Sequence, residues 1–211
     1  QYSGLNKTTL FRILGALESE GLLERTPDGR YYLGSEVIAL GGRAARANDL
    51  RAVSHAHLQK LTDLTGETCT LEILHADGEE WVMLVIDEVL GRYLVGAAQY
   101  IGSRLPVHAT STGKAVLAFT DDVRRSHILR GGFSQFTEMT IGTVDAFEAR
   151  LAEVRQNGYA VAMGELERGL VAISAPIFNV NGAVQAALSL TGPSVRLHVD
   201  DVERLAQIII E

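Results

Sequence analysis

The 211-residue sequence has one cysteine, no apolar stretch of membrane-spanning length, no signal peptide and no excess of positive charge. A single cysteine cannot form an internal disulfide, and the place of Cys69 in the apolar run 68–74 predicts a core residue in a reducing compartment. The lack of a spanning segment and of a signal peptide favours a cytoplasmic protein with no membrane partner, although a signal lost ahead of residue 1 stays open. Internal repeats are also absent, which excludes a repeat architecture.

The first positive feature is a helix signal near the start of the sequence. Asn6 can cap the free backbone N–H groups of a helix that begins at Lys7. Apolar residues then recur at helical spacing, which predicts one face packed inward; they are Leu10, Ile13, Leu14 and Leu17. The opposite face carries polar and basic side chains at its N-terminal end, as does a helix that lies in the DNA major groove; they are Lys7, Thr8, Thr9 and Arg12.

A hairpin signal follows the helix, which is expected to end at Gly21. Two strand-like runs, 22–25 and 30–33, flank a turn with the sequence Thr-Pro-Asp-Gly, and Asp-Gly between strands is typical of a hairpin. Arg25 and Arg30 lie where the wing of a winged helix-turn-helix reaches the DNA backbone or minor groove. An amphipathic helix plus a hairpin also occurs in many enzymes. The order and spacing within these 31 residues nevertheless favour a DNA-binding element.

The charge is unevenly distributed along the chain. The net charge of −7 excludes a general polyanion-binding protein. Residues 1–51 hold seven Lys and Arg against six Asp and Glu, a net of +1, which leaves −8 for the other 160 residues. A near-neutral head on an acidic body is typical of a protein that binds DNA locally and weakly per head, and that gains strength by self-association.

The length and the 46% hydrophobic content allow one small domain and one ordinary domain. Residues 1–34 are expected to form the second half of a winged helix-turn-helix DNA-binding domain, and residues 35–49 a linker helix. Residues 50–211 are expected to form one α+β domain. The pair Gly41-Gly42, which costs about 1 kcal/mol per glycine in a helix relative to alanine, favours a linker that bends or packs closely against a partner helix.

The second domain is expected to begin with a helix over 50–65 whose apolar face includes His57. We interpret His57 as a core histidine, and because His55 points to another side of the helix, a metal pair is not expected there. The apolar and turn patterns that follow predict an antiparallel sheet with helices banked against it. The expected strands are 68–75, 81–88, 92–98, 159–163, 170–178 and 183–190, and the expected helices are 112–119, 121–129, 143–157 and 199–210.

The segment 105–114, LPVHATSTGK, leads from a loop into a helix. The free N–H groups and the positive dipole end of that helix form an anion site, with Ser111, Thr112 and Gly113 where a carboxylate would lie. The pattern matches neither a phosphate-binding P-loop nor the Gly-x-Ser-x-Gly motif of hydrolases. A plain N-cap formed by Thr110 or Ser111 is the structural alternative.

Three stretches, in this order, resemble the IclR family of bacterial transcription regulators, and the resemblance covers essentially the whole chain. They are GLNKTTLFRILGALESEGLLERTPDGRYYLG at 4–34, LPVHATSTGKAVLA at 105–118 and GYAVAMGELERGLVAISAPIFNVNGAVQAALSLTGP at 158–193. The resemblance implies a winged helix-turn-helix, a linker helix that helps dimerisation, and a GAF-like effector domain that binds a small organic acid. It also implies dimers or dimers of dimers on operator DNA.

The resemblance implies a set of effector-binding residues as well. The carboxylate of the effector would lie against Ser111, Thr112 and Gly113, with the hydroxyls of two residues on a strand beside it. These are Ser189 and Thr191, and the implied apolar contacts are near Leu94, Ala97, Leu170 and Ala172.

One position departs from the family pattern, because Ala162 stands where the family commonly has an aspartate. An acidic partner for the effector is therefore expected to be missing, and the pocket is expected to be roomier and less polar. This favours a bulkier acid, with aromatic acids as candidates, over a two- or three-carbon oxoacid. Glu165, Glu167 and Arg168 lie in the next loop, which we interpret as a solvated turn.

The sequence thus predicts an effector-responsive transcription regulator, expected to be a repressor of a catabolic operon and not an enzyme. An enzyme that uses the same pocket through His108 and a serine is a competing class, but no orienting acid stands at a recognisable motif. A metal-dependent sensor is the other competitor. Neither a metal nor a cofactor is expected, because the histidines match no compact site; they are His55, His57, His75, His108, His127 and His198.

Members of the family normally have one helix and the start of a second ahead of the position of Gln1. Without those helices, the chain is expected to keep the residues that contact DNA and to bind an operator weakly.

Overall fold

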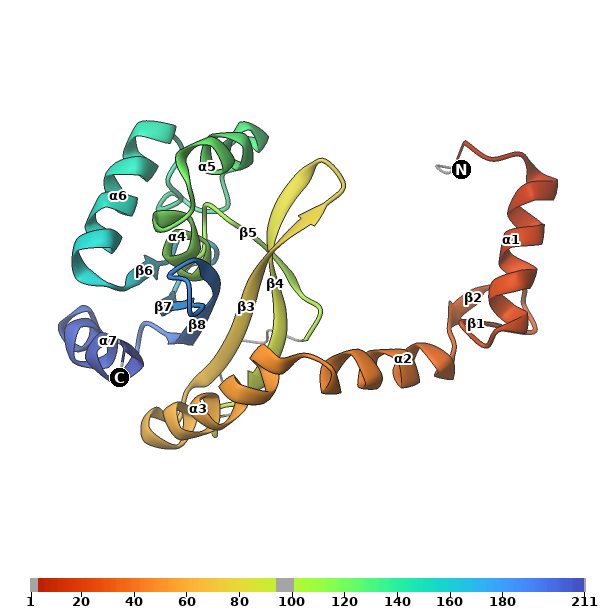
Figure 1. Cartoon of the computed structure of the whole chain (residues 1–211), viewed down its shortest axis with the longest axis horizontal. Helices are drawn as coiled ribbons and strands as arrows, with labels where there is room; N and C mark the ends of the chain where they lie inside the picture. Colours follow the sequence, from red (N-terminus) through yellow and green to blue (C-terminus); the bar gives the residue numbers. More distant parts are fainter. Residues whose placement is uncertain (1–3, 94–100, 211) are drawn as a thin grey trace. The chain divides into compact units, whose positions relative to one another are not determined.

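The computed structural model describes residues 4–93 and 101–210. The chain forms two compact units, residues 1–52 and residues 53–211, whose helices and strands are labelled in Figure 1. Within the described residues, none of the helices is long and apolar enough to cross a membrane.

The first unit consists of a capped helix, a hairpin and a second helix. α1 (Lys7–Ser19) begins where the sequence predicted, because Asn6 Oδ1 accepts a hydrogen bond from the Thr9 N–H at 2.8 Å. β1 (Leu23–Arg25) and β2 (Tyr31–Leu33) pair in antiparallel fashion. The Thr26 side chain closes the turn between them: its hydroxyl donates to Asp28, and its oxygen accepts from the Arg30 N–H at 3.0 Å.

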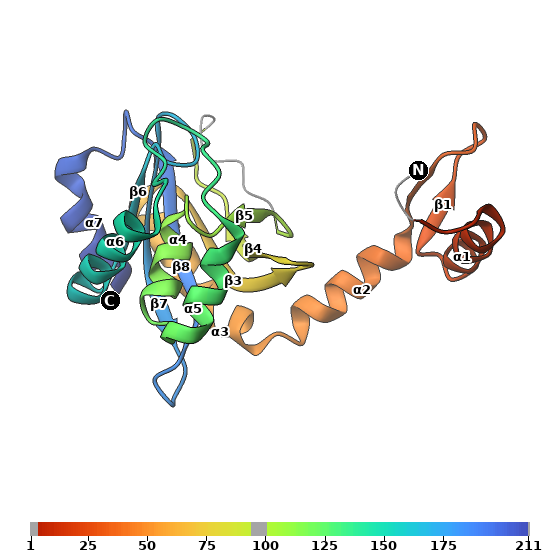
Figure 2. The same ribbon diagram turned by 90° about the horizontal axis from the view of Figure 1, so that it is seen from above.

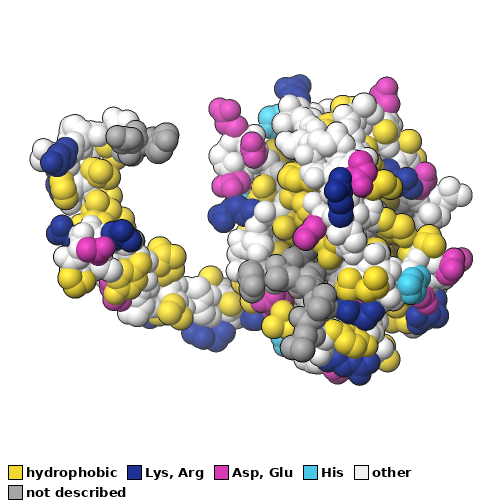
Figure 3. Space-filling view, turned by 180° about the vertical axis from the view of Figure 1, so that it is seen from behind, with side chains coloured by type: hydrophobic (Ala, Val, Ile, Leu, Met, Phe, Trp, Pro, Cys, Tyr) yellow, Lys and Arg dark blue, Asp and Glu magenta, His cyan; other side chains and the backbone are white. Residues whose placement is uncertain are grey.

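The apolar face predicted for α1 is only partly covered. Leu14 and Leu17 are half-buried, whereas Leu10 and Ile13 are 36% and 41% exposed. The prediction of an inward-packed stripe is therefore wrong for the N-terminal half of the helix. The physical reason is that the chain returns along the C-terminal end of α1, where the Leu22 N–H donates to the Leu17 carbonyl at 2.9 Å. Figure 3 shows hydrophobic side chains, in yellow, on the surface of this unit.

The buried face of the helix at the start of the second unit also differs from the prediction. α2 spans Ser35–Arg46 and α3 spans Asp49–Thr65. The buried side chains of α3 are Ser54, Leu58, Leu61 and Thr62. Val53 and Leu64 are 70% and 60% exposed, and His57 is exposed, so the interpretation of His57 as a core histidine is wrong. Small polar side chains take part of the buried face instead, and the Thr62 hydroxyl donates to the Val89 carbonyl at 3.4 Å.

The second unit is an α+β domain built on one antiparallel sheet of six strands. The strand order is β5-β4-β3-β8-β7-β6. The bounds of the strands are β3 (Thr68–Asp77), β4 (Glu80–Val89), β5 (Arg104–Pro106), β6 (Ala160–Met163), β7 (Leu170–Phe178) and β8 (Val184–Pro193). Five of these correspond to predicted strands, whereas β5 was not predicted. The strand expected over 92–98 falls largely on residues 94–100, which lie outside the described residues.

Helices pack on both faces of this sheet. They are α4 (Ser111–Ala118), α5 (Asp122–Ile128), α6 (Val144–Asn157) and α7 (Val202–Ile210). Figure 2 shows α4, α5 and α6 grouped together beside the sheet. Phe147 and Leu151 of α6 and Leu117 of α4 are fully buried in the main hydrophobic core on that face. α7 packs against β7 and β8 on the other face, where side chains of α3 and α7 line a hollow together with strand residues of β7 and β8.

Candidate functional site

Two rows of small and hydroxyl-bearing side chains cross the sheet on the face that α4 covers. They share that face because residues two apart in a strand point the same way. One row runs Thr68, Thr191, Ala172 and Ala162, and the neighbouring row runs Thr70, Ser189, Ser174 and Ala160, each in register across β3, β8, β7 and β6. Glu72 follows two residues after Thr70, so its side chain lies on the same face.

α4 directs its N-terminal end at these rows. Thr110 caps the helix: its side-chain oxygen accepts from the Gly113 N–H at 3.2 Å, and its carbonyl accepts from the Lys114 N–H at 3.3 Å. The N–H groups of Ser111 and Thr112, in the first turn, have no acceptor within the helix. Both residues are 1% exposed. The positive end of the helix dipole therefore lies in a desolvated place, where it favours an anion.

Gly113 has a packing role at this end of the helix. A Cβ atom at this position would lie 1.9 Å from the carbonyl oxygen of Val107, so only glycine lets the loop before α4 lie against the helix. Gly113 was predicted to contact the effector, but it is not among the residues that line the cavity described below. Its contact with the loop is what positions the two free N–H groups.

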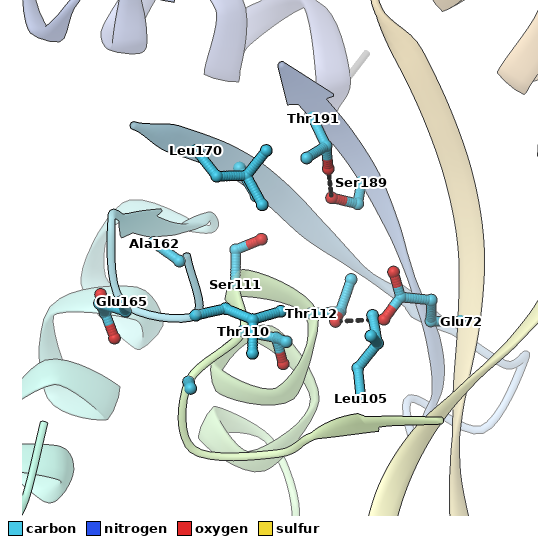
Figure 4. A pocket seen from close by; sticks show the side chains of 13 residues that line it. Glu72, Leu105, Thr110, Ser111, Thr112, Ala162, Glu165, Leu170, Ser189 and Thr191 are labelled. Atoms are coloured by element: carbon cyan, nitrogen blue, oxygen red, sulfur yellow. Dashed lines mark hydrogen bonds between the residues drawn. The ribbon is translucent and has the colours of Figure 1, made fainter. Parts of the chain in front are cut away.

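Hydrogen bonds tie the hydroxyls at this end of α4 to the sheet. The Ser111 and Ser174 hydroxyl oxygens are 2.6 Å apart, and those of Ser189 and Thr191 are 3.1 Å apart. The Thr112 hydroxyl donates to Glu72 Oε2 at 2.5 Å. Figure 4 shows Thr112 and Glu72 facing each other, with Ser189 and Thr191 beside them on β8.

Glu72 is a buried carboxyl group at the centre of β3, with 1% of its surface exposed. Thr70 donates to Glu72 Oε1 at 2.8 Å, and Thr112 donates to the other oxygen. Burial raises the pKa of Glu72 above its ordinary value, and the hydrogen bonds from the two threonines only partly oppose this. The group therefore holds its proton to a higher pH than an exposed glutamate does.

A buried ion pair fixes the loop on the other side of α4. Lys114 Nζ lies 2.5 Å from Glu165 Oε1 and donates to the Val161 carbonyl at 2.8 Å. Burial lowers the pKa of Lys114, while the neighbouring carboxylate of Glu165 acts in the opposite direction. The Thr140 hydroxyl donates to the Glu165 carbonyl at 2.6 Å, which holds the loop backbone. The interpretation of this loop as a solvated turn is therefore wrong for Glu165, which is 8% exposed.

These groups surround a small cavity. Its volume is about 20 Å³, which is room for roughly one water molecule. Most of the effector-binding residues predicted from the sequence line it; they are Ser111, Thr112, Ala162, Leu170, Ala172, Ser189 and Thr191. Leu94 and Ala97 lie outside the described residues. The remaining lining residues are Glu72, Leu105, Ala109, Thr110, Glu165 and Leu166.

The expectation that an acidic partner is missing from the pocket is wrong. Ala162 is indeed small, but Glu72 from β3 and Glu165 from the loop after β6 both line the cavity. The cavity is also not roomy, since its volume is about 20 Å³. Local sequence held no signal for either glutamate. Glu72 was counted only within an expected strand, and Glu165 only within a turn.

A larger hollow on the other face of the sheet has a different character. It measures about 550 Å³ and is lined mainly by apolar side chains of α3, α7, β7 and β8, among them Val53, Phe178 and Ile209. This groove has a mainly hydrocarbon lining and no helix N-terminus among its lining residues. The small cavity at α4, with its hydroxyls and free N–H groups, is therefore the candidate site for an anion.

Metal-binding groups do not gather in the described parts of the chain. Among those residues, no three His, Cys, Asp or Glu side chains come together in a way that could hold a metal ion. His108, the residue considered for catalysis, has its Nε2 2.9 Å from the Ser134 carbonyl and packs against Phe133 with ring centroids 5.2 Å apart. His55 Nδ1 is 2.8 Å from Asp87 Oδ2.

The first unit presents several of the predicted DNA-contacting side chains to solvent. Lys7, Thr8 and Arg12 on α1 are exposed, as are Arg25 and Arg30 on the hairpin. Thr9 is half-buried, and the Asn6 side chain is used to cap the helix. Two of the hairpin side chains have local partners, because the Arg25 guanidinium lies 5.7 Å from the centre of the Tyr31 ring and Arg30 Nε lies 3.2 Å from Asp28 Oδ2.

An exposed helix with a hairpin that carries Arg25 and Arg30 in one unit, and a polar cavity at a helix N-terminus in an α+β unit, are together typical of DNA-binding transcription regulators. Residues 42–211 match the family described as "Bacterial transcriptional regulator IclR C-terminal". The chain therefore belongs to the IclR family of bacterial transcription regulators.

Individual relatives agree with this assignment. The chain is 35% identical over 202 residues to the HTH-type transcriptional regulator XynR of Escherichia coli. The matched region covers 95% of this chain and 78% of XynR. It is 28% identical over 213 residues to the transcriptional repressor IclR of the same species, covering 100% of the chain and 77% of that protein.

A solved structure extends the comparison. An IclR homologue of Microbacterium hydrocarbonoxydans, complexed with 4-hydroxybenzoate, matches with a TM-score of 0.81 and 27% identity, covering 97% of this chain and 82% of that one. These relatives are regulators, so the enzyme alternative is set aside.

Proposed function

We propose that this regulator represses a catabolic operon and responds to a small organic acid that binds in the cavity at the N-terminus of α4. One observation carries the proposal: the first N–H groups of α4, which have no acceptor within the helix, meet two hydroxyl-bearing sheet rows at a buried cavity. Such an arrangement stabilises a carboxylate without any full positive charge at the contact. The name of the transcriptional repressor IclR supports the sign of the response.

The carboxylate of the acid is proposed to accept hydrogen bonds from the backbone N–H groups of Ser111 and Thr112. The hydroxyls of Ser189 and Thr191 are bonded to each other at 3.1 Å, and each has one proton to donate. On binding they are proposed to exchange that bond for bonds to the effector. Leu170 and Ala172 supply apolar surface to the carbon skeleton.

Binding of an acid requires the cavity to open. A volume of about 20 Å³ admits roughly one water molecule, so the lining must move apart to admit any organic acid. The preference for an aromatic acid depended on a roomy pocket, which the structure does not have. In addition, no aromatic side chain is among the described residues that line the cavity. The 4-hydroxybenzoate in the relative from Microbacterium hydrocarbonoxydans keeps aromatic acids within the proposed class.

The first unit is proposed to contact operator DNA through residues 1–34, with α1 in the major groove and the hairpin as a wing. The exposed side chains of Lys7, Thr8 and Arg12 would contact base edges and phosphates, and Arg25 and Arg30 would contact the backbone or minor groove. Asn6 and Thr9 form the cap that fixes the start of the helix, so their contribution is to its position.

Self-association as dimers or dimers of dimers is proposed to proceed partly through the linker helix α2. Ile38 is 79% exposed and Leu40 is 45% exposed, which gives α2 an apolar surface suited to a second copy. A Cβ at Gly41 would meet nothing within 4 Å, and one at Gly42 would meet only the Arg46 side chain. The glycine pair therefore leaves room for close approach of a partner helix, which would couple the effector domain to the spacing of the DNA-binding heads.

The test replaces Ser189 by Ala and Thr191 by Val in one protein, with the exposed Ser126→Ala as the matched control. A thermal-shift screen of organic acids identifies a stabilising acid for the unmodified protein, and a gel shift with the gene's upstream region measures DNA binding. The double variant is expected to lose at least tenfold in acid affinity, by analogy with other lost hydrogen bonds to charged groups, while apo DNA binding is unchanged. Unchanged acid affinity would refute the site.

A further inference from the structure

Two carboxyl groups line a cavity that is proposed to receive an anion. Glu72 and Glu165 are 1% and 8% exposed, and both belong to the lining. Burial of a carboxyl group is costly unless hydrogen bonds compensate for the lost water. The ammonium group of Lys114 compensates Glu165, but a pocket for a plain carboxylate gains nothing from Glu72, so the presence of Glu72 indicates that the ligand carries something more than a carboxylate.

Glu72 has unused capacity to accept hydrogen bonds. A carboxyl group keeps acceptor lone pairs whether or not it is protonated, and Glu72 accepts one hydrogen bond at each oxygen, from Thr70 and from Thr112. Because Thr112 also supplies one of the free N–H groups of α4, the carboxylate site and the Glu72 carboxyl are adjacent. Figure 4 shows the Glu72 side chain extending from β3 toward the start of α4.

Glu165 adds an acceptor on the other side of the cavity. Its Oε1 is bound by Lys114, whereas its Oε2 is buried and accepts no hydrogen bond from any residue that the structure describes. The positive charge of Lys114 is already matched by Glu165, and burial favours the uncharged form of Glu72. The acceptors in the lining therefore favour a ligand with a neutral hydrogen-bond donor over a ligand with an additional positive charge.

We propose that the effector is a hydroxylated carboxylic acid, and that Glu72 is the specificity-determining residue that accepts a hydrogen bond from its hydroxyl group. This assignment rests on the acid-sensing function proposed above and names the effector class for the same site. The carboxylate lies at the N–H groups of Ser111 and Thr112, and a hydroxyl group donates to Glu72. An acid without a hydroxyl group leaves the buried acceptor unpaired and binds more weakly.

The experiment measures the affinities of matched acids by calorimetry for the whole chain. The pairs are glycerate and propionate, gluconate and hexanoate, and 4-hydroxybenzoate and benzoate, so aliphatic and aromatic sources of the same chemistry are separated. A further pair, alanine and lactate, compares a ligand with an ammonium donor and a ligand with a hydroxyl donor. For at least one pair, the unmodified protein is expected to bind the hydroxylated acid about tenfold or more tightly than the unhydroxylated acid. This factor corresponds to the loss of one hydrogen bond to a buried charged or polar group.

Two variants locate that preference. Glu72→Gln keeps an acceptor oxygen and is expected to retain the preference within about threefold. Glu72→Leu removes the acceptor at similar volume, and is expected to bring the ratio to about one while binding the unhydroxylated acid as well or better. Glu79→Gln, in the exposed turn between β3 and β4, is the matched control. Circular dichroism of each variant confirms that it is folded.

The outcomes separate the two proposals. Acid binding with no preference for hydroxyl groups, tighter binding of alanine than of lactate, or an unchanged preference in Glu72→Leu overturns the role of Glu72 and leaves acid sensing intact. A failure of every acid to bind the unmodified protein overturns both. A preference that is abolished by Glu72→Leu and retained by Glu72→Gln supports the assignment, because a purely structural role would change the affinity for both members of a pair alike.

Discussion

Removal of the lysine from the buried Lys114–Glu165 pair should destabilise the effector domain strongly. The side chains of the two residues are 0% and 10% exposed, and their charged atoms are 2.5 Å apart. Lys114→Met fills a similar volume but leaves the buried carboxylate of Glu165 without its ammonium partner. Breaking a buried ion pair in this way typically lowers the free energy of unfolding by about 3–5 kcal/mol. The double variant Lys114→Met with Glu165→Met removes the stranded carboxylate, and is expected to recover at least half of that loss.

The measurements are urea unfolding and thermal unfolding of each variant, both followed by circular dichroism at neutral pH. For a chain of this size, 1 kcal/mol corresponds to roughly 2–4 °C in the unfolding temperature, so Lys114→Met should unfold about 6–20 °C below the unmodified protein. Lys60→Met, at an exposed position of α3, is the control and should change the free energy of unfolding by less than about 0.5 kcal/mol. A loss below about 1 kcal/mol for Lys114→Met, or an equal loss in the double variant, would refute the reasoning.

Three other predictions follow from buried groups of the same domain. Burial raises the pKa of the Cys69 thiol to about 12, so in the native protein at about pH 8 it should react with a thiol reagent at least roughly a hundredfold more slowly than in urea. The raised pKa of Glu72 gives a stability that is complete below its ordinary value of 4.5 and is lost as the pH rises through the folded value; the thermal stability of Glu72→Gln relative to the unmodified protein should therefore increase as the pH is raised from 4.5. Gly113→Ala forces a Cβ toward the Val107 carbonyl, so it should cost at least about 1–3 kcal/mol in urea unfolding.

Each of these predictions has a result that would contradict it. Equal thiol reactivity in the native and unfolded states would mean that Cys69 is accessible. A stability difference for Glu72→Gln that does not change with pH would mean that its carboxyl has the same pKa in both states. Gly15→Ala, in open space on α1, is the control for Gly113→Ala and should stabilise by up to about 1 kcal/mol; similar effects at both glycines would remove the close contact as the cause.

Local patterns predicted much of the architecture. The cap formed by Asn6 and the hairpin after α1 depend on neighbours within a few residues, and both are present as expected. Signals of this kind are short-ranged, so a single sequence can carry them. Ser189 and Thr191 were implied by the family resemblance alone, and both line the cavity from β8.

The errors arose where burial depends on distant parts of the chain. Glutamate is rarely buried, and nothing near Glu72 in the sequence indicates that Thr112, forty residues later, will bond to it. The same limitation applies to Glu165, whose partner Lys114 is 51 residues away. In α3 the sequence predicted the wrong buried face. The face that is buried contains Ser54 and Leu58, one position further along the helix than the predicted face with His57.

In the proposed acid sensor, the near-absence of free space in the cavity would set the range of acid concentrations over which the regulator responds. Because an acid binds only to molecules in which the lining has separated, its apparent dissociation constant equals the intrinsic constant divided by the fraction of molecules that are open. The concentration at which the gene responds is therefore adjustable without any change to the groups that contact the effector. Substitutions in the loop around Glu165, which bias opening, should move this set point while the order of preference among acids stays the same.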